Sequence, residues 1–301
     1  FFVFIYFFNH LYHQLCLCCC LGFTPGRLRP IFEPMKTVKR LALSVVLVLI
    51  APTFVAGEII GRSVEGRTIS VERLGDGPTD VLVVGGIHGG YEANSIALSR
   101  RLLKHYRNNP ADLPGEFTLH VIDNMNPDGL YRITEGTPID EFNFRAVNTV
   151  PGRFNARGVD LNRNWDGDWQ PTSYWGQREV DAGSAPFSEP ETRAVRDYFF
   201  EIEPVASVFF QSAAAGIWFS GAEDGWEPSR RLALAYSRAS GYRMPEPDDG
   251  PVDYEITGSA DDYFYEIGHR NLTIELTTHY DIEWDRNLAG FRAFLQALQN
   301  Q

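Results

Sequence analysis

Cysteine is absent from most of this sequence. All four cysteines fall between positions 16 and 20, and the 281 residues that follow contain none. A domain built from those residues has no disulfide, no thiolate nucleophile and no cysteine ligand for a metal. Any catalysis or metal binding there must use other side chains.

Lysine is almost as scarce, and the charge is strongly acidic. After residue 56 only Lys104 remains. Residues 1–56 carry five of the 27 basic and one of the 39 acidic residues, which leaves 22 Lys and Arg against 38 Asp and Glu, a net charge of about −16. Such a charge argues against nucleic acid or an anionic membrane as a partner. We expect a monomer that binds neither.

The segment 35–57 has the pattern of a secretory signal peptide. An apolar core over 41–55 leads to the small pair Ala56-Gly57, and the core follows a basic start formed by Lys36, Lys39 and Arg40. The alternative is a real hydrophobic anchor, but the core is shorter than a membrane span of about 20 residues, so we expect cleavage and no stable anchor. This predicts a secreted or periplasmic protein. Residues 1–34 open without Met and are interpreted as upstream sequence translated from a misplaced start.

Residues 58–301 are expected to form one domain in which strands alternate with helices. Short apolar runs predict strands, and apolar residues at helical spacing predict helices. The expected strands are 81–84, 116–123, 205–211, 217–220 and 271–276, after a hairpin over 59–74; the expected helices are 93–106, 188–202, 229–240, a short one from 259, and 284–299. We predict an α/β fold with a mixed, mostly parallel central sheet and helices on both faces.

The connecting stretches carry strong local signals. Asn126-Pro127-Asp128-Gly129 predicts a turn after the second strand. Residues 130–187 show little periodicity and are interpreted as a long ordered loop, which in a compact domain is usually functional. Ser188-Glu189-Pro190-Glu191 is typical of a capping box with Pro in the first turn. Ser259, with Asp262 three residues later, predicts another helix start.

A Gly-rich turn after the strand 81–84 carries the first candidate site. His88 and Glu92 stand four residues apart at the carboxyl end of that strand, where chemistry gathers in open α/β sheets. An imidazole and a carboxylate at this spacing could bind one zinc ion. The alternative is a polar turn in which the charge of Glu92 only complements the dipole of the following helix.

Later stretches point to a family. Asn126–Gly129, the run Val159-Asp160-Leu161-Asn162-Arg163-Asn164-Trp165 and the strand Thr273–Leu276 follow one another in this order. In these motifs, residues 58–301 resemble the zinc metallocarboxypeptidases of family M14. The resemblance implies a carboxypeptidase-like α/β/α fold, a Zn²⁺ cofactor and hydrolysis of the C-terminal bond of peptides or proteins.

The resemblance also implies catalytic roles. A zinc ion at His88 and Glu92 would activate a water, with Glu275 as general base and Arg145 stabilising the oxyanion. Outside the family, Glu275 would be a carboxylate at a strand end and Arg145 half of a surface ion pair. The residues alone leave both interpretations open.

Four further residues are implied in substrate binding. Asn162 and Arg163 match the pair that holds the terminal carboxylate, and Tyr254 matches a tyrosine that folds over bound substrate. Asp261 aligns with the floor of the side-chain pocket, where an acid favours a terminal Arg, Lys or diaminopimelate. The plainer interpretations are a turn for the first pair, packing for Tyr254 and a helix start for Asp261.

The pattern breaks at the family's third zinc ligand. That ligand is a His on the strand 205–211, where this sequence has Gln211, and a neutral amide oxygen is a much poorer zinc ligand than imidazole. His279, four residues after Glu275, is the nearest replacement in sequence. Three hypotheses follow: an exported zinc carboxypeptidase, a catalytically impaired relative that binds peptide C-termini, and an amidase or carboxypeptidase acting on cell-wall peptides near diaminopimelate. Retention of Glu275 and Arg145 favours an enzyme, whereas Gln211 favours a binding protein. We predict the first: hydrolysis of a C-terminal peptide bond by a zinc-bound water, with Glu275 as general base.

Overall fold

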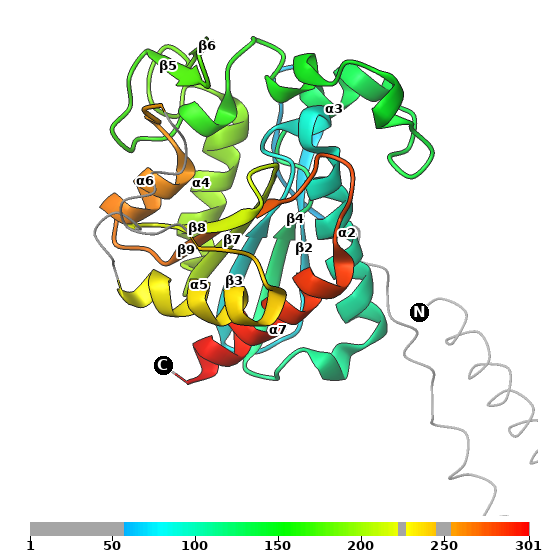
Figure 1. Cartoon of the computed structure of the whole chain (residues 1–301), viewed down its shortest axis with the longest axis vertical. Coiled ribbons are helices and arrows are strands. Elements are labelled where there is room, and N and C mark those ends of the chain that lie inside the picture. The colour runs from blue at the N-terminus through cyan, green and yellow to red at the C-terminus, as the bar shows by residue number, and fades with distance from the viewer. Residues whose placement is uncertain (1–56, 222–226, 245–253, 301) are drawn as a thin grey trace, which may run out of the picture. The chain divides into compact units, whose positions relative to one another are not determined.

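A seven-stranded sheet forms the centre of the molecule (Figure 1). The computed structural model describes residues 57–221, 227–244 and 254–300. In spatial order the strands are β1 (Glu58–Arg62), β2 (Thr68–Leu74), β4 (Phe117–Ile122), β3 (Thr79–Val84), β7 (Ala206–Ser212), β9 (Asn271–Leu276) and β8 (Gly216–Phe219). β4, β3, β7 and β9 run parallel, and the other three pair antiparallel. The predicted α/β fold with a mixed, mostly parallel sheet is confirmed.

Helices cover both faces of this sheet (Figure 1). One face packs against α2 (Ala93–Asn108), α5 (Glu227–Ser240) and α7 (Trp284–Gln299), and the other against α4 (Pro190–Ile202) and α6 (Ala260–Glu266). Successive side chains of a strand point to opposite faces, so Val81 and Val83 join the first cluster whereas Leu82 and Val84 join the second. A strand buried on both sides explains why the run 81–84 is apolar without interruption.

Two predictions at helix starts are wrong. Asn126–Gly129 is not a free turn, because Pro127 begins α3 (Pro127–Thr134) and the Asn126 side chain accepts the N–H of Gly129 at 2.8 Å. An Asn N-cap followed by Pro has the same composition as a turn, which explains the error. Ser188 does not cap α4 either: the N-cap is Glu189, and the Ser188 hydroxyl donates to the Glu189 carboxylate at 3.0 Å.

The remaining boundaries agree better with the sequence. β9 and α7 span 271–276 and 284–299 as predicted, and Ser259 caps α6 by accepting the N–H of Asp262 at 3.1 Å. The stretch 130–187 is not one loop, because it contains most of α3, several short 3₁₀ turns and a hairpin of β5 (Thr172–Trp175) and β6 (Arg178–Asp181).

No helix within 57–221, 227–244 or 254–300 is long and apolar enough to cross a membrane. The expected signal peptide and residues 1–34 lie outside the described residues, apart from Gly57.

The carboxyl ends of β3, β7 and β9 meet at one edge of the sheet because these strands are parallel neighbours. Gln211 pairs in register with Glu275 at that edge. The turn after β3 passes through Gly89, whose φ is +45° and where a Cβ would lie 2.8 Å from the Asn126 carbonyl oxygen. Only glycine permits this turn. The turn brings His88 to the same edge, and the candidate site lies there.

Candidate functional site

A cavity of about 760 Å³ opens over the carboxyl edge of the sheet, a volume typical of sites for small ligands. Two groups of residues face it. We call His88, Glu92, Gln211 and Glu275 the strand-end wall; Arg153, Asn162 and Arg163, which Asp160 backs, form the loop wall. Tyr254, Asp261 and His279 also line the cavity. Of the site residues predicted from sequence, only Arg145 does not.

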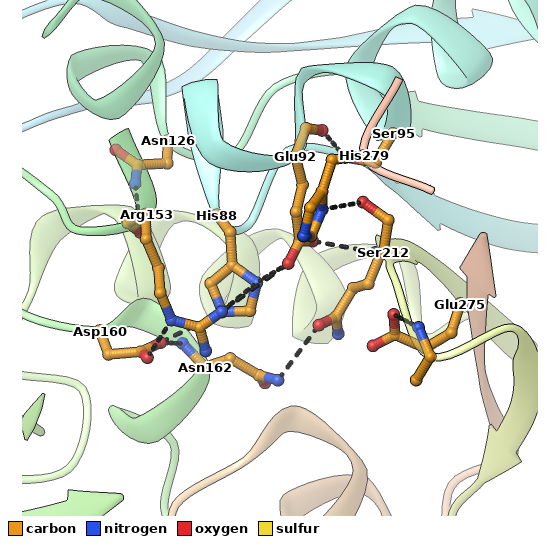
Figure 2. Close-up of polar contacts among 12 residues, drawn as sticks. His88, Glu92, Ser95, Asn126, Arg153, Asp160, Asn162, Ser212, Glu275 and His279 are labelled. Atoms are coloured by element: carbon orange, nitrogen blue, oxygen red, sulfur yellow. Dashed lines mark hydrogen bonds and ion pairs between the residues drawn. The ribbon is translucent and has the colours of Figure 1, made fainter. Parts of the chain in front are cut away.

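His88 and Glu92 lie together at the bottom of the strand-end wall, each almost completely buried. His88 Nδ1 is 2.8 Å from Glu92 Oε1, and its Nε2 is 3.2 Å from Asp160 Oδ1 (Figure 2). The second oxygen of Glu92 accepts the N–H of Ser212 at 3.2 Å. A carboxylate behind an imidazole fixes its ring orientation, as carboxylates do for histidines that bind metals.

Arg153 and Asp160 are functional residues that sequence reasoning missed. Arg153 Nε donates to Asp160 Oδ2 at 2.8 Å, and its Nη1 lies 3.4 Å from His88 Nδ1 and 3.7 Å from Glu92 Oε1 (Figure 2). Burial opposes ionisation of Asp160, but the charge of Arg153, with His88 and Arg163, holds the pKa of Asp160 well below its usual range. Asp160 lies in the run Val159–Trp165 with Asn162, but no signal in the sequence marked Arg153.

Arg145 lies elsewhere. Its guanidinium stacks over the Tyr280 ring, 4.2 Å from the centroid, and is 3.6 Å from the Asp281 carboxylate. The side chains of Arg145 and Asp281 are both 62% exposed. The guanidinium that faces the strand-end wall therefore belongs to Arg153.

The orientation of the Gln211 amide follows from a short chain of hydrogen bonds. The backbone N–H of Ala260 donates to Asn162 Oδ1 at 3.1 Å, so the Nδ2 of Asn162 points the other way and donates to Gln211 Oε1 at 3.4 Å. This leaves Gln211 Nε2 buried, with no partner in the described part of the chain.

This donor set does not fit a catalytic zinc site, which needs three protein ligands. His88 and Glu92 supply two ligands, but the one oxygen of Gln211 already accepts from Asn162, and the Arg153 cation lies beside both. His279 does not complete the set: its Nδ1 is 3.0 Å from the Ser212 hydroxyl, and it forms no metal-binding group with two other His, Asp or Glu side chains of the described residues. Among the described residues, no three His, Cys, Asp or Glu side chains form a metal-binding group.

Glu275 lies at the end of β9 and, among the described residues, has one hydrogen-bond donor, the N–H of Ala214 at 3.2 Å. Burial and, after it, the charge of Glu92 raise the pKa of Glu275 to about 8. Its carboxyl group is therefore mainly protonated at neutral pH in this arrangement.

The loop wall presents a buried cation toward the cavity. Arg163 donates through Nε and Nη2 to the Tyr174 carbonyl, at 3.1 and 2.9 Å, and through Nη1 to the Asn162 carbonyl at 2.6 Å. Its remaining N–H groups have no partner among the described residues. Burial lowers the pKa of Arg163, although Asp160 opposes this effect.

Asp261 stands at another part of the lining, near the strands. Its Oδ1 accepts from Asn271 Nδ2 at 2.5 Å and from the Thr273 hydroxyl at 3.0 Å. Burial, followed by the neighbouring Asp262, raises the pKa of Asp261 to about 6, against the two hydrogen bonds. Behind it, the Ser207 hydroxyl donates to Asn271 Oδ1 at 2.7 Å and lies 3.1 Å from His269 Nε2.

Sequence comparisons connect this chain with carboxypeptidases. Residues 47–291 match the family Peptidase_M14, described as zinc carboxypeptidase. Carboxypeptidase B of Astacus astacus is 27% identical over 233 residues, which cover 70% of this chain and 75% of that protein. The carboxypeptidase N catalytic chain of Homo sapiens is 31% identical over 157 residues, covering 45% of this chain and 33% of that one.

Solved structures share the fold. Bovine thrombin-activatable fibrinolysis inhibitor superposes with a TM-score of 0.63 at 19% identity, covering 82% of this chain and 91% of its own. Murein-tripeptide amidase MpaA from Escherichia coli O157 superposes with a TM-score of 0.55 at 21% identity, covering 80% and 91%. At these identities the similarity supports the architecture.

Proposed function

Because the chain belongs to the zinc carboxypeptidase family, we propose that its cavity binds the free C-terminus of a peptide or protein. The observation that carries this proposal is the loop wall: Arg163 is almost completely buried, yet some of its N–H groups have no partner among the described residues. A buried guanidinium with spare donors suits a carboxylate, which can accept two parallel hydrogen bonds. Asn162 beside it and Tyr254 across the cavity would complete the site.

We propose that the terminal residue is basic. Asp261 lies in the cavity lining with only one of its oxygens engaged by Asn271 and Thr273. An ionised acid there would pair with a terminal Arg or Lys, or with the free amine of diaminopimelate in a cell-wall peptide. Its pKa of about 6 leaves it mainly ionised at neutral pH.

The remaining expectations concern the whole protein. The segment 35–57 supports export to the periplasm or the medium, and 58–301 would be the mature domain. The acidic balance supports a monomer that does not bind nucleic acid or stay at the membrane.

Hydrolysis of the terminal peptide bond is the second candidate function. Glu275 favours it, because a protein that only binds peptides needs no general base. The metal-ligand set opposes it, because Gln211 stands where the family has its third zinc ligand.

The test compares binding with turnover. Peptides ending in Arg, in Leu or in a blocked Arg amide are titrated into the purified chain by calorimetry, and release of the terminal residue is followed with added zinc. We expect binding of the free Arg terminus, weaker binding of the Leu terminus, no binding of the amide, and no release. Gln211→His is the matched variant for turnover. Equal binding of the free acid and the amide would contradict the proposal, and release by the wild-type chain would establish the second candidate.

A further inference from the structure

Gln211 has a feature that the recognition of a C-terminal carboxylate does not explain. It is 2% exposed, lines the cavity at the end of β7, and its Nε2 is a buried donor without a partner in the part of the chain that the structure describes. A buried N–H that lacks an acceptor is unfavourable, and a bound oxygen would satisfy it. The residue therefore indicates that the ligand brings an oxygen to this position.

The surrounding bonds determine which end of the amide is free. A backbone N–H cannot accept, so Ala260 requires Asn162 to present its oxygen, and Asn162 then offers N–H to Gln211. Gln211 must therefore accept with its oxygen, which lies 3.4 Å from Asn162 Nδ2. The free end is an N–H donor, which repels a metal ion and attracts a carbonyl or carboxylate oxygen.

The charge around Gln211 agrees with this assignment. Arg153 lies within 3.4 Å of His88 Nδ1 and 3.7 Å of Glu92 Oε1, so a protein cation already stands next to the two groups that would otherwise hold a metal. Its charge is balanced by the carboxylates of Asp160 and Glu92, so an uncharged carbonyl oxygen suits this position better than a further ion.

We propose that Gln211 Nε2 donates a hydrogen bond to the carbonyl oxygen of the last peptide bond of the bound ligand, and that binding needs no metal. This inference rests on the proposed function. With the terminal carboxylate at Arg163, the preceding carbonyl lies about one residue further along the ligand, roughly 3.8 Å. Asn162 stands next to Arg163 on the loop wall and hydrogen-bonds Gln211 on the strand-end wall. The amide of Gln211 is therefore the next polar group of the cavity lining after Asn162.

The experiment pairs two ligands with three variants. The first ligand is a peptide ending in Arg, and the second replaces its last peptide bond by a trans-alkene, which keeps the shape and removes the carbonyl oxygen together with the amide N–H. Gln211→Glu removes the N–H donor in the same volume, and Gln211→Met removes it without adding charge if the buried carboxylate disturbs folding. Gln296→Glu, on the exposed side of α7, is the control for the change in charge. Dissociation constants are measured with zinc and with EDTA.

The expected result is that the wild-type chain and Gln296→Glu bind the peptide about 3- to 10-fold more tightly than the alkene, the range of one hydrogen bond. The two Gln211 variants should bind both ligands equally, and EDTA should change nothing. A Gln211→Met chain that still prefers the peptide, or a wild-type chain that loses the peptide in EDTA, overturns the inference while leaving C-terminal recognition intact. A wild-type chain that binds no free C-terminus contradicts the proposed function itself, and with it the inference.

Discussion

The two walls of the cavity differ in how completely their polar groups are paired. On the loop wall, the Asp160 carboxylate pairs with Arg153 and His88 and accepts the backbone N–H of Asn162. Both the oxygen and the nitrogen of the Asn162 side-chain amide are hydrogen-bonded. On the strand-end wall, within the part of the chain that the structure describes, Gln211 has an unpaired donor and Glu275 has a single hydrogen bond. The contacts that support the loop wall around Asp160 are therefore complete, and among the described residues spare donors remain at Arg163 on this wall and at Gln211 on the strand-end wall.

The largest expected effect concerns the loop wall and its stability. Asp160→Ala removes the partner of the buried Arg153 and should lower the free energy of unfolding by about 3–5 kcal/mol, the usual effect of leaving a buried charge unpaired. Urea unfolding followed by circular dichroism measures it. Asp123→Ala, which breaks the exposed Arg100–Asp123 pair, is the control and should change it by no more than about 1 kcal/mol. Similar values for the two variants would show that the loop wall is not a rigid support.

The next effect concerns pH. Below about pH 6 Asp261 takes up a proton, so affinity for a peptide ending in Arg should fall about 10-fold between pH 7.5 and 5, whereas a peptide ending in Leu should not follow this curve. Asp261→Asn should weaken Arg binding at neutral pH and remove the pH dependence. Titration calorimetry at several pH values measures both.

The same carboxyl group affects stability with the opposite sign. Its pKa is higher folded than the ordinary value of 3.8, so the folded chain holds the proton more tightly and the contribution of Asp261 to the free energy of unfolding falls as pH rises through about 4 to 6. Asp261→Asn should therefore lose less stability than the wild type over this interval. If the affinity of the wild-type chain for a peptide ending in Arg does not change with pH, Asp261 does not belong to the binding site.

A smaller effect tests how Asp261 is held. Burial lowers the pKa of His269 to about 3, so its neutral ring can donate to Ser207, which donates to Asn271, which donates to Asp261. Ser207→Ala breaks this series and allows the Asn271 amide to turn. We expect a loss of about 1 kcal/mol in the free energy of unfolding and an upward shift of the pH midpoint of Arg binding.

Ser99→Ala is the matched control for that change. Ser99 is also a fully buried serine, but it donates to the Ser95 carbonyl within α2, away from Asp261. Ser99→Ala should not change the pH midpoint of binding of the peptide ending in Arg. If both variants behave alike, the series behind Asp261 has no influence on the binding site.

The sequence predicted the framework well because local signals decide it. β9 and α7 begin and end where the apolar pattern does, and the strand-end wall follows from strands whose carboxyl ends share one edge. The helix at Pro127 was mistaken for a turn, since capping and turning use the same residue types.

The loop wall was harder to predict because tertiary contacts, not local pattern, distinguish its arginines. Arg145, Arg153 and Arg157 are alike in sequence, and only the fold buries Arg153 beside Asp160. The place of Gln211 at the end of its strand could be predicted from the sequence. Which atom of its amide is left unpaired depends on the backbone N–H of Ala260, 49 positions away in the chain. Such a contact leaves no signal in a single sequence.

The smallest expected effect separates the two candidate arginines. Arg145→Ala removes an exposed ion pair with Asp281 and a stacking contact with Tyr280, so stability should change by less than about 1 kcal/mol and peptide affinity should not change. Arg153→Lys keeps a cation beside Asp160 but loses the planar fork, and should weaken peptide binding more strongly. Calorimetric titration of both variants with the peptide ending in Arg decides between them. If Arg145→Ala weakens binding while Arg153→Lys does not, the exposed arginine moves into the cavity when ligand binds, and the Arg153–Asp160 pair is not what positions the ligand.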